Sequence, residues 1–261
     1  MLKTNRIFCG DVLSKLKKIP DGRIDLIVSD IPYKIIAGGV TIKYSKNECS
    51  GILQKRAISD GTKCSNKWLK KDALTIPSAV KNGKMFANND IQFSEWLPEV
   101  FRVLKQRTHC YLMVNGRNLK TLQIEAEKVG FIYQNLLIWN KGNCTPNKYY
   151  MQCCEFILML RKGKARSINN MGEKTLLTVP NIIGTKNHPT EKPVELMKIL
   201  IENSSNENDI VLDPFCGTGA TVIACIELKR RFIGIDINRE YCDIAATRIN
   251  EQSQKEKNEK T

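Results

Sequence analysis

Two short motifs, each placed directly after an apolar run, constrain the fold of this chain most strongly. The run 24–28 precedes Ser-Asp-Ile-Pro-Tyr at 29–33, and the run 209–212 precedes Asp-Pro-Phe-Cys-Gly-Thr-Gly at 213–219. Short runs rich in Val, Ile and Leu are typical of strands buried on both faces of a sheet. Because both motifs follow strands, we expect them at the carboxyl edge of one parallel sheet. Open α/β sheets bind their ligands at that edge.

The rest of the chain alternates between strand and helix patterns. We expect strands at 6–9, 24–29, 109–114, 132–139, 155–161, 209–212 and 231–236, and helices at 12–18, 93–105, 119–129 and 220–228, with Ser94 capping the second helix. This order predicts an α/β fold with a doubly wound, mostly parallel sheet. The length of 261 residues suits one domain over 1–250, and the polar segment 251–261 is expected to be a disordered tail.

Basic residues gather in two parts of the chain, whose formal net charge is +14. Segment 34–84 holds eleven Lys and Arg against three Asp and Glu, and segment 141–174 holds seven against two. Residues 37–85 also lack a sustained period, so we interpret them as an insertion. A basic surface of this kind suits nucleic acid, with 37–85 and 163–187 as candidate contact and recognition regions. The plainer alternative is a solvated, Lys-rich surface.

Other features exclude several classes of protein. No apolar run approaches the roughly 20 residues that cross a bilayer, and residues 1–6 lack the apolar core of a signal peptide. We therefore expect a cytoplasmic protein with no membrane partner. Of the ten cysteines, those at 9, 110, 153, 154, 216 and 225 lie inside or beside apolar strand and helix patterns, without paired C-x-x-C spacing. They are expected to be reduced, small hydrophobic residues, and no metal site is predicted.

The motif at 29–33 has a specific chemical logic. An exocyclic amine on adenine or cytosine is a poor nucleophile, because its lone pair is delocalised into the ring. Acceptors aimed at both amine hydrogens stabilise the positive charge that develops on attack. Asp30 supplies one acceptor and the carbonyl of Ile31 a second, while Pro32 restricts Ile31 to an extended conformation. Tyr33 offers a face for a base turned out of its stack. Alone, such a motif is more often a simple turn.

The glycine motif indicates a nucleoside site rather than a phosphate loop. No Lys-Ser/Thr follows Gly219, and the spacing is not that of a dinucleotide-binding loop. The next strand, 231–236, ends at Asp236, about where an acid binds ribose hydroxyls. The alternative is a glycine turn and a strand-capping Asp of the kind any α/β protein contains.

Together these segments resemble the S-adenosylmethionine-dependent amino-methyltransferases of DNA, in the arrangement called β. In these enzymes the Asp-Pro-Pro-Tyr segment precedes the cofactor motif. Gly10-Asp11 resembles the family's N-terminal Gly-Asp, segment 187–196 its His-Pro-x-x-Lys-Pro, and segment 232–236 its ribose-binding strand end, where Glu is usual. The resemblance covers nearly the whole chain apart from 37–85. It implies a Rossmann-like methyltransferase sheet with a circularly permuted order of motifs.

The resemblance also implies an activity and a set of site residues. The enzyme would turn an adenine out of double-stranded DNA and transfer to its N6 amine the methyl group of S-adenosylmethionine, without a metal. The catalytic residues would be Asp30, Ile31, Pro32 and Tyr33. The cofactor would contact Asp11, Asp30, Lys192, Asp213, Pro214, Phe215, Gly217, Thr218, Gly219 and Asp236, with Lys192 near its carboxylate end.

One departure leaves alternatives open. The family usually has Pro where this chain has Ile31, which restores a backbone N–H but keeps the carbonyl, so we expect activity. An acid at position 30 favours adenine in this family, whereas cytosine enzymes more often begin with Ser. Methylation of cytosine N4, methylation of an RNA or protein amine, and a weakened DNA-binding regulatory module are the alternatives. A homodimer and a cognate restriction endonuclease are open as partners.

Overall fold

The computed structural model describes residues 2–32, 91–145, 150–164, 166–182 and 191–258. All of these residues belong to one unit of the chain, formed by 1–33 and 90–261. The expected insertion at 37–85 lies outside the described residues, as do Tyr33 and the first part of the His-Pro-x-x-Lys-Pro segment.

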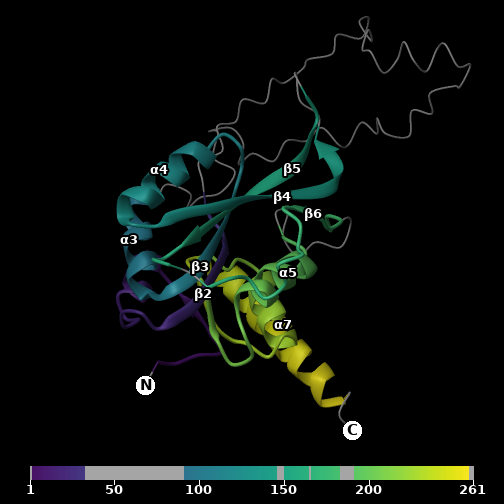
Figure 1. Cartoon of the computed structure of the whole chain (residues 1–261). Helices are drawn as coiled ribbons and strands as arrows, with labels where there is room; N and C mark the ends of the chain where they lie inside the picture. Colours follow the sequence, from purple (N-terminus) through teal and green to yellow (C-terminus); the bar gives the residue numbers. More distant parts are fainter. Residues whose placement is uncertain (1, 33–90, 146–149, 165, 183–190, 259–261) are drawn as a thin grey trace, which may run out of the picture. The chain divides into compact units, whose positions relative to one another are not determined.

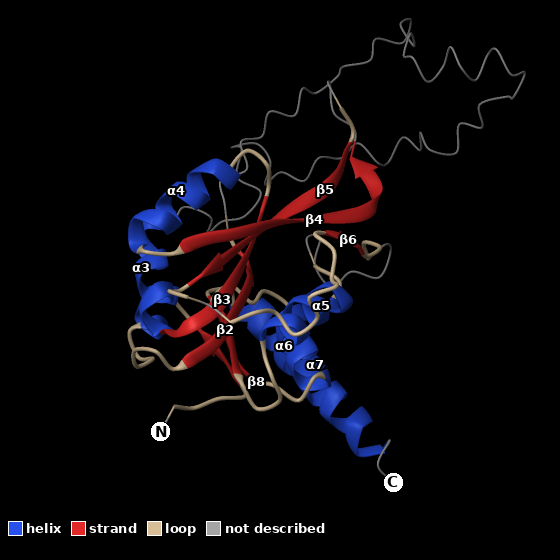
Figure 2. Ribbon diagram, in the orientation of Figure 1, coloured by secondary structure: helices blue, strands red, loops and turns tan. Residues whose placement is uncertain are grey.

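One eight-stranded sheet forms the centre of the described chain, in the order β1-β8-β7-β2-β3-β5-β4-β6 (Figure 2). Its strands are β1 (Arg6–Cys9), β2 (Ile24–Asp30), β3 (Leu104–Val114), β4 (Ile132–Thr145), β5 (Gln152–Arg161), β6 (Leu176–Thr178), β7 (Ile210–Asp213) and β8 (Arg231–Asp236). Neighbouring strands are parallel except at β5, which runs antiparallel to both β3 and β4. The prediction of a mostly parallel α/β sheet is therefore confirmed.

Helices cover both faces of the sheet, as a doubly wound fold requires (Figure 1). One layer contains α1 (Val12–Leu16), α3 (Phe93–Val103) and α4 (Leu119–Val129). The other contains α5 (Val194–Ser204), α6 (Ala220–Glu227) and α7 (Arg239–Asn258). None of the helices within the described residues is long and apolar enough to span a membrane.

Each helical layer encloses its own hydrophobic core against the sheet. Ile27 of β2 packs in the core with Trp96 and Leu97 of α3, whereas Leu26 and Val28 face the core beneath α5 and α6. All five of these side chains are fully buried. Burial on both faces explains why the parallel strands appear in the sequence as continuous apolar runs.

The strand register brings the carboxyl ends of four neighbouring strands to one edge. Cys9 of β1 lies beside Asp236 of β8, and Asp213 of β7 lies beside Gly234. Leu212 pairs with Ile27, so β7 ends close to the end of β2. The two motifs therefore leave the sheet at the same edge, as the sequence predicts.

Some predicted boundaries are wrong. The N-cap of α3 is Gln92 rather than Ser94, in a reciprocal capping box with Glu95. The expected helix 93–105 ends at Val103, and β3 begins at Leu104 rather than at residue 109. Arg107, with φ of 67°, lies in the stretch where β3 shifts register against β2. Such an irregularity hides the first part of a strand from a search for regular patterns.

The prediction of a disordered tail at 251–261 is also wrong for its described part, 251–258. Helix α7 continues to Asn258, although the described chain becomes polar after residue 250. Glu, Gln and Lys dominate this stretch, and these residues have good helix propensity. A helix already nucleated by its packed first turns extends at little cost, because only nucleation is unfavourable.

Candidate active site

Asp30 is the last residue of β2, and its side chain is 28% exposed at the carboxyl edge of the sheet. Burial of the carboxyl raises its pKa, against the opposing effect of the nearby Lys192 ammonium. Ile31, which follows, is 2% exposed and belongs to the core shared with α3. The residue that replaces the family's usual proline therefore contributes its side chain to the core.

Asp213 joins the two motifs directly. Its Oδ1 accepts a hydrogen bond of 2.6 Å from the hydroxyl of Ser29, the residue before Asp30. The same oxygen accepts a bond of 3.1 Å from the backbone N–H of Phe215. Asp213 is 4% exposed, and burial raises its pKa to about 6 despite these hydrogen bonds. Asp213 therefore holds the glycine turn against the end of β2.

The glycine turn between β7 and α6 needs backbone conformations that favour glycine. Gly217 and Gly219 have φ of 50° and 87°, and a Cβ on Gly219 would lie 3.0 Å from the Cβ of Ala245 in α7. The backbone N–H of Gly217 donates to Asp236 Oδ2 at 2.9 Å. The carboxylate of Asp236 thus orders the turn from the end of the neighbouring strand.

The Gly-Asp step at 10–11 lies beside Asp236. The N–H of Gly10 donates to the carbonyl of Asp236 at 2.8 Å. Asp11 is exposed and caps α1, since its Oδ2 accepts a bond of 2.8 Å from the N–H of Ser14. Phe215 is half-buried, and its ring meets that of Trp96 edge to face with centroids 5.1 Å apart. Gly10, Phe215 and Asp236 therefore lie at the carboxyl ends of β1, β7 and β8.

Lys192 completes a group of four charges, here called the Lys192 cluster: Asp30, Lys141, Glu155 and Lys192. Its Nζ lies 2.7 Å from Asp30 Oδ2 and 3.2 Å from Glu155 Oε2. The Nζ of Lys141 lies 3.2 Å from the other oxygen of Glu155. Burial opposes ionisation of Glu155, but the two ammonium groups outweigh it and lower its pKa. The structure thus pairs Lys192 with the predicted catalytic carboxylate.

Arg248 of α7 connects the turn to the segment that contains Lys192. Its Nη1 donates to the carbonyl of Thr218 at 2.8 Å and lies 2.7 Å from Glu191 Oε1. The side chain of Glu191 is 4% exposed. A buried ion pair of this kind fixes the spacing between the two segments, because neither charge can leave its partner without cost.

The sequence analysis missed Glu155, Lys141 and Arg248. Glu155 had a signal, because it begins the predicted strand 155–161 with a charge ahead of a wholly apolar run. Its place at the site follows from the antiparallel register, in which Ile157 pairs with Met113 and Met113 with Asp30. Glu155 therefore lies two residues beyond that row, at the carboxyl edge.

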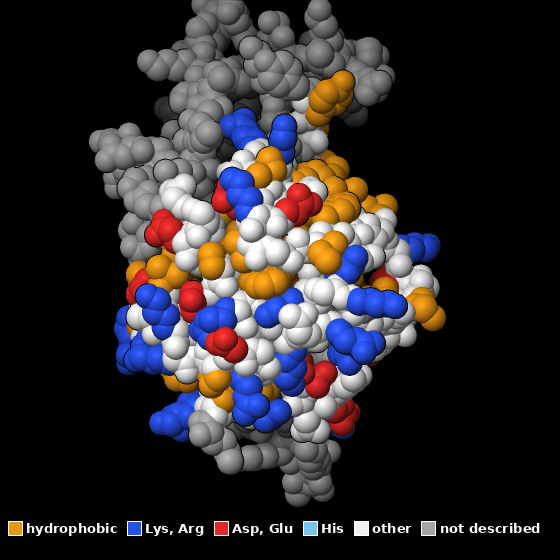
Figure 3. Space-filling model, turned by 60° about the vertical axis from the view of Figure 1, so that its left-hand side comes forward, with side chains coloured by type: hydrophobic (Ala, Val, Ile, Leu, Met, Phe, Trp, Pro, Cys, Tyr) orange, Lys and Arg blue, Asp and Glu red, His pale blue; other side chains and the backbone are white. Residues whose placement is uncertain are grey.

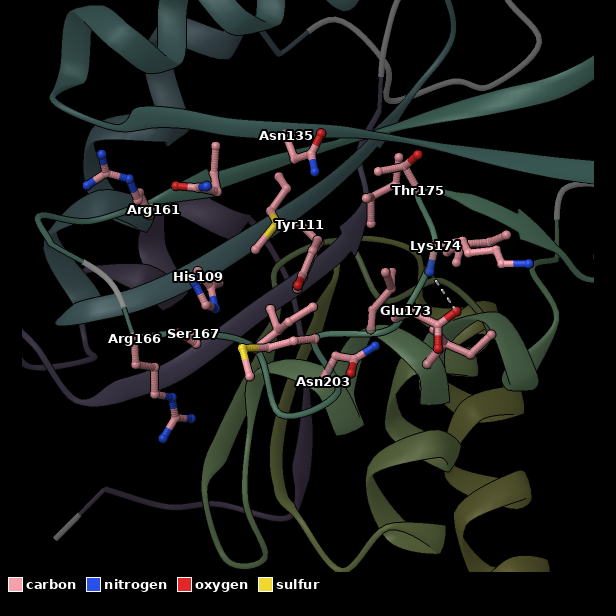
Figure 4. Close-up of a pocket in the computed structure, with 18 of the residues that line it drawn as sticks. His109, Tyr111, Asn135, Arg161, Arg166, Ser167, Glu173, Lys174, Thr175 and Asn203 are labelled. Atoms are coloured by element: carbon pink, nitrogen blue, oxygen red, sulfur yellow. Dashed lines mark hydrogen bonds between the residues drawn. The ribbon is translucent and has the colours of Figure 1, made fainter.

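A cavity of about 450 Å³ lies elsewhere, between the sheet and α5 (Figure 4). His109 and Tyr111 of β3, Asn135 of β4 and Asn203 of α5 line it, with Arg161 and Arg166 at one side. None of the described motif residues is among its lining residues. His109 and Tyr111 both bond to the hydroxyl of Ser204. This cavity is therefore separate from the candidate site at the strand edge.

Among the described residues there is no group of three or more His, Cys, Asp and Glu arranged to hold a metal ion. The described cysteines are free, and four of them are buried: Cys110, Cys216, Cys225 and Cys242. Burial raises the pKa of the Cys225 thiol, which suits an inert small hydrophobic residue.

Comparison with known proteins gives a consistent result. A family model described as DNA methylase matches residues 24–181 and 169–247. The Type II methyltransferase M.HinfI of Haemophilus influenzae is 29% identical over an alignment of 270 residues, which covers 95% of this chain and 68% of that protein. The Type II methyltransferase M2.MboI of Moraxella bovis is 26% identical, with 98% of this chain and 92% of that protein covered.

Solved structures share the fold. The M1.HpyAVI-SAM complex superposes with a TM-score of 0.64 at 24% identity, covering 93% of this chain and 98% of that one. The cytosine-N4-specific PvuII DNA methyltransferase superposes with a TM-score of 0.65 at 16% identity, covering 97% of this chain and 92% of that one. At these identities the similarity supports the architecture of the sheet.

The residues at the strand edge fit S-adenosylmethionine. The turn brings the bare backbone of Gly217 and Gly219 to the edge, and the Asp236 carboxylate ends the next strand, where ribose hydroxyls bind in sheets of this type. Asp11 directly follows the glycine that bonds to Asp236, and Phe215 offers an apolar ring. With the family match spanning most of the sequence, the chain belongs to the DNA methylase family, the S-adenosylmethionine-dependent amino-methyltransferases of DNA.

Proposed function

We propose that the protein methylates the N6 amine of adenine in duplex DNA, after turning the adenine out of the helix. The observation that carries this proposal is the position of Asp30. It ends β2 at the carboxyl edge and is joined through Ser29 and Asp213 to the glycine turn. A carboxylate at this position favours adenine in the family, where cytosine enzymes more often have Ser.

The protein's own groups account for activation of the amine. Asp30 and the carbonyl of Ile31 accept the two amine hydrogens, which directs the nitrogen lone pair out of the ring plane and stabilises the positive charge formed on attack. Tyr33, outside the described residues, is proposed to stack on the extruded base. When bound, S-adenosylmethionine supplies an electrophilic methyl group on a sulfonium. The proposed cofactor contacts at Asp11, Phe215, the glycine turn, Asp236 and Lys192 would align that methyl group with the amine.

The described residues of the candidate recognition segment 163–187 lie near two different edges of the sheet. Asn169 bonds to backbone atoms of residues 202, 203 and 205, at the end of α5 remote from Lys192. By contrast, β6 pairs with 138–140 of β4, and the N–H of Asn181 donates to the carbonyl of Lys141. An 11-residue helix such as α5 is about 16 Å long. We therefore narrow the proposed DNA contact in this segment to residues 176–187.

The charges on one face of the described molecule agree with a DNA contact that lies elsewhere. Figure 3 shows the side of the molecule toward which α3 and α4 are turned, and Lys and Arg are scattered over this face with Asp and Glu among them. No basic stripe of the kind that tracks a phosphate backbone is visible on the described part of this face. The proposal assigns the main DNA contact to the basic segment 37–85, which lies outside the described residues.

One experiment tests the base and the substrate together. Unmethylated genomic DNA is incubated with the protein and methyl-labelled S-adenosylmethionine, digested to nucleosides and separated. A parallel sample is sequenced for modified bases. We expect label in N6-methyldeoxyadenosine at a single sequence motif, and none with the Asp30→Ala variant.

The other outcomes discriminate between the alternatives. Label in N4-methyldeoxycytidine would show that the target base is cytosine and not adenine, with the same fold and cofactor. Absence of label in DNA, with label in RNA or protein supplied in parallel reactions, would overturn the assignment of duplex DNA. Cofactor binding without transfer to any of these would identify a regulatory module instead.

A further inference from the structure

Lys192 occupies one oxygen of the Asp30 carboxylate, the group that the target amine needs as an acceptor. Its ammonium lies 2.7 Å from Asp30 Oδ2, and its side chain is only 9% exposed. A buried ammonium this close to a carboxylate neutralises much of the carboxylate's charge. If it stayed there during the reaction, Asp30 would stabilise the developing positive charge on the amine less well.

A second carboxylate is already within reach of the same ammonium. Glu155 Oε2 lies 3.2 Å from Lys192 Nζ, and the Glu155 side chain is 22% exposed. A small displacement of Nζ toward Glu155 would release Asp30 while keeping the ammonium paired. Without Glu155 the same displacement would take a buried ammonium away from both carboxylates of the cluster, which is unfavourable.

The surroundings of the two carboxylates favour the ionised form of Glu155 more than that of Asp30, as a transfer of the ammonium to Glu155 requires. Burial raises the pKa of Asp30, whereas Lys192 and Lys141 together outweigh burial at Glu155 and lower its pKa. Lys141 binds Glu155 Oε1 at 3.2 Å, so Glu155 is held by ammonium groups on both oxygens. Glu155 is therefore the better permanent partner for Lys192.

From this geometry we infer that Glu155 is a positioning residue of the methyl-transfer site, which takes the Lys192 ammonium when the target amine replaces it on Asp30. Glu155 acts through Lys192 and Asp30 and does not itself contact the base. The inference rests on the proposed function, since it needs an amine that binds at Asp30.

The test compares three variants with the wild-type protein in steady-state transfer to genomic DNA: Glu155→Gln, Lys192→Met and the double variant. Glu155→Gln leaves Lys192 with Asp30 as its carboxylate partner within the cluster. Its kcat should therefore fall roughly tenfold to a hundredfold, with an increase in the KM for DNA. Its affinity for S-adenosylmethionine, measured by calorimetry, should stay within about twofold of wild type. Removing Lys192 as well should recover part of the lost kcat at saturating cofactor.

A matched control is available in the ion pairs of Lys198, within α5 and between α5 and α6. Lys198 is shared between Glu195 and Glu227, at 3.3 and 3.1 Å, much as Lys192 is shared between Asp30 and Glu155. Glu227 is also partly buried, so Glu227→Gln removes a comparable charge without touching the strand edge. This variant should transfer methyl groups at the wild-type rate.

The outcomes separate the inference from the function beneath it. If Glu155→Gln transfers as fast as Glu227→Gln, Glu155 does not position Lys192. If its loss of kcat matches a loss of folded protein in urea unfolding, or is not relieved by Lys192→Met, its role is only structural and the inference is wrong. A wild-type protein that transfers no methyl group to DNA would overturn the proposed function, and this inference with it.

Discussion

At the scale of single residues, Asp30 is held independently of any substrate by one direct partner and by a bond that its neighbour Ser29 makes. Its carboxylate pairs with Lys192, and the residue before it, Ser29, bonds to Asp213. Lys192 also pairs with Glu155, so removal of the Asp30 side chain leaves the ammonium with a carboxylate. The site can therefore lose this acceptor without collapse of the charges around it.

Replacement of Asp30 by Ala should abolish methyl transfer and spare cofactor binding. The amine loses an acceptor that stabilises its charge in the transition state, whereas the glycine turn and Asp236 remain in place. Transfer is measured in a single turnover with labelled cofactor, and affinity by calorimetry. Equal losses of transfer and affinity would place Asp30 in the cofactor site instead.

The sequence predicts the motif residues of the candidate site better than their partners. Asp30 and Asp213 follow apolar runs within short motifs, and such local patterns are visible in one sequence. The pairing of Lys192 with Glu155 depends on the antiparallel register of β5 and on the start of α5. Register is set by side-chain packing across the sheet and cannot be predicted from a local sequence pattern. For this reason the sequence analysis placed Lys192 only near the cofactor.

At the scale of elements, the turn between β7 and α6 is held by contacts from three sides. Asp213 bonds to Phe215 within the turn, Asp236 of β8 bonds to Gly217, and Arg248 of α7 bonds to the carbonyl of Thr218. A turn fixed in this way presents its backbone in one conformation, which lowers the entropic cost of binding a ligand there.

Gly219→Ala should weaken both the fold and cofactor binding. A residue with a Cβ at φ of 87° is strained by about 1–2 kcal/mol, and its Cβ would meet that of Ala245 at 3.0 Å. We expect a lower midpoint in urea unfolding and an affinity for S-adenosylmethionine reduced roughly tenfold, which corresponds to about 1.4 kcal/mol.

Two further variants separate strain from contact. Gly217 has φ of 50°, and a Cβ added there would have no atom within 4 Å, so Gly217→Ala should lower the free energy of unfolding less than Gly219→Ala. Ala245→Gly removes the opposing methyl group, and in a double-mutant cycle it should offset part of the Gly219→Ala loss. Equal costs for the two glycine variants, with no coupling to residue 245, would show that backbone conformation alone is at issue.

At the scale of the whole molecule, the alternation of strands and helices was sufficient to predict a doubly wound, mostly parallel sheet, but β6, α5 and α7 were not predicted. The error in the tail has the opposite origin. Composition alone cannot tell a polar helix that continues a packed one, such as the end of α7, from an unstructured segment, because both lack an apolar stripe. The polar end of α7 is helical because it continues a helix whose first turns are packed against the sheet.

Two buried groups on opposite sides of β2 link the stability of the fold to pH. Asp213 is 4% exposed and its pKa is raised to about 6, chiefly by burial. His109 is 2% exposed and its pKa is lowered to about 4, by burial and by the positive charges of Arg166 and Arg161. The two pKa values have moved in opposite directions from their ordinary values of 3.8 and 6.5.

The signs of the two contributions are therefore opposite over one pH window. Between about pH 4 and 6 the folded protein holds a proton on Asp213 that the unfolded chain releases, so this group destabilises the fold as the pH rises. In the same window the unfolded chain holds a proton on His109 that the folded protein does not, so this group stabilises the fold as the pH rises. Each effect amounts to about 3 kcal/mol in full, and in the wild-type protein the two nearly cancel.

Removing one group at a time should expose the other. As the pH falls from 7 to 4, the free energy of unfolding of Asp213→Asn should decrease by about 3 kcal/mol relative to wild type. That of His109→Asn, which keeps a polar atom near the hydroxyl of Ser204, should increase by a similar amount, and the double variant should run parallel to wild type. Urea unfolding at a series of pH values measures all four proteins, and subtraction of the wild-type curve removes the other titrating groups. Differences that stay constant across this window would show that neither side chain titrates as its burial requires.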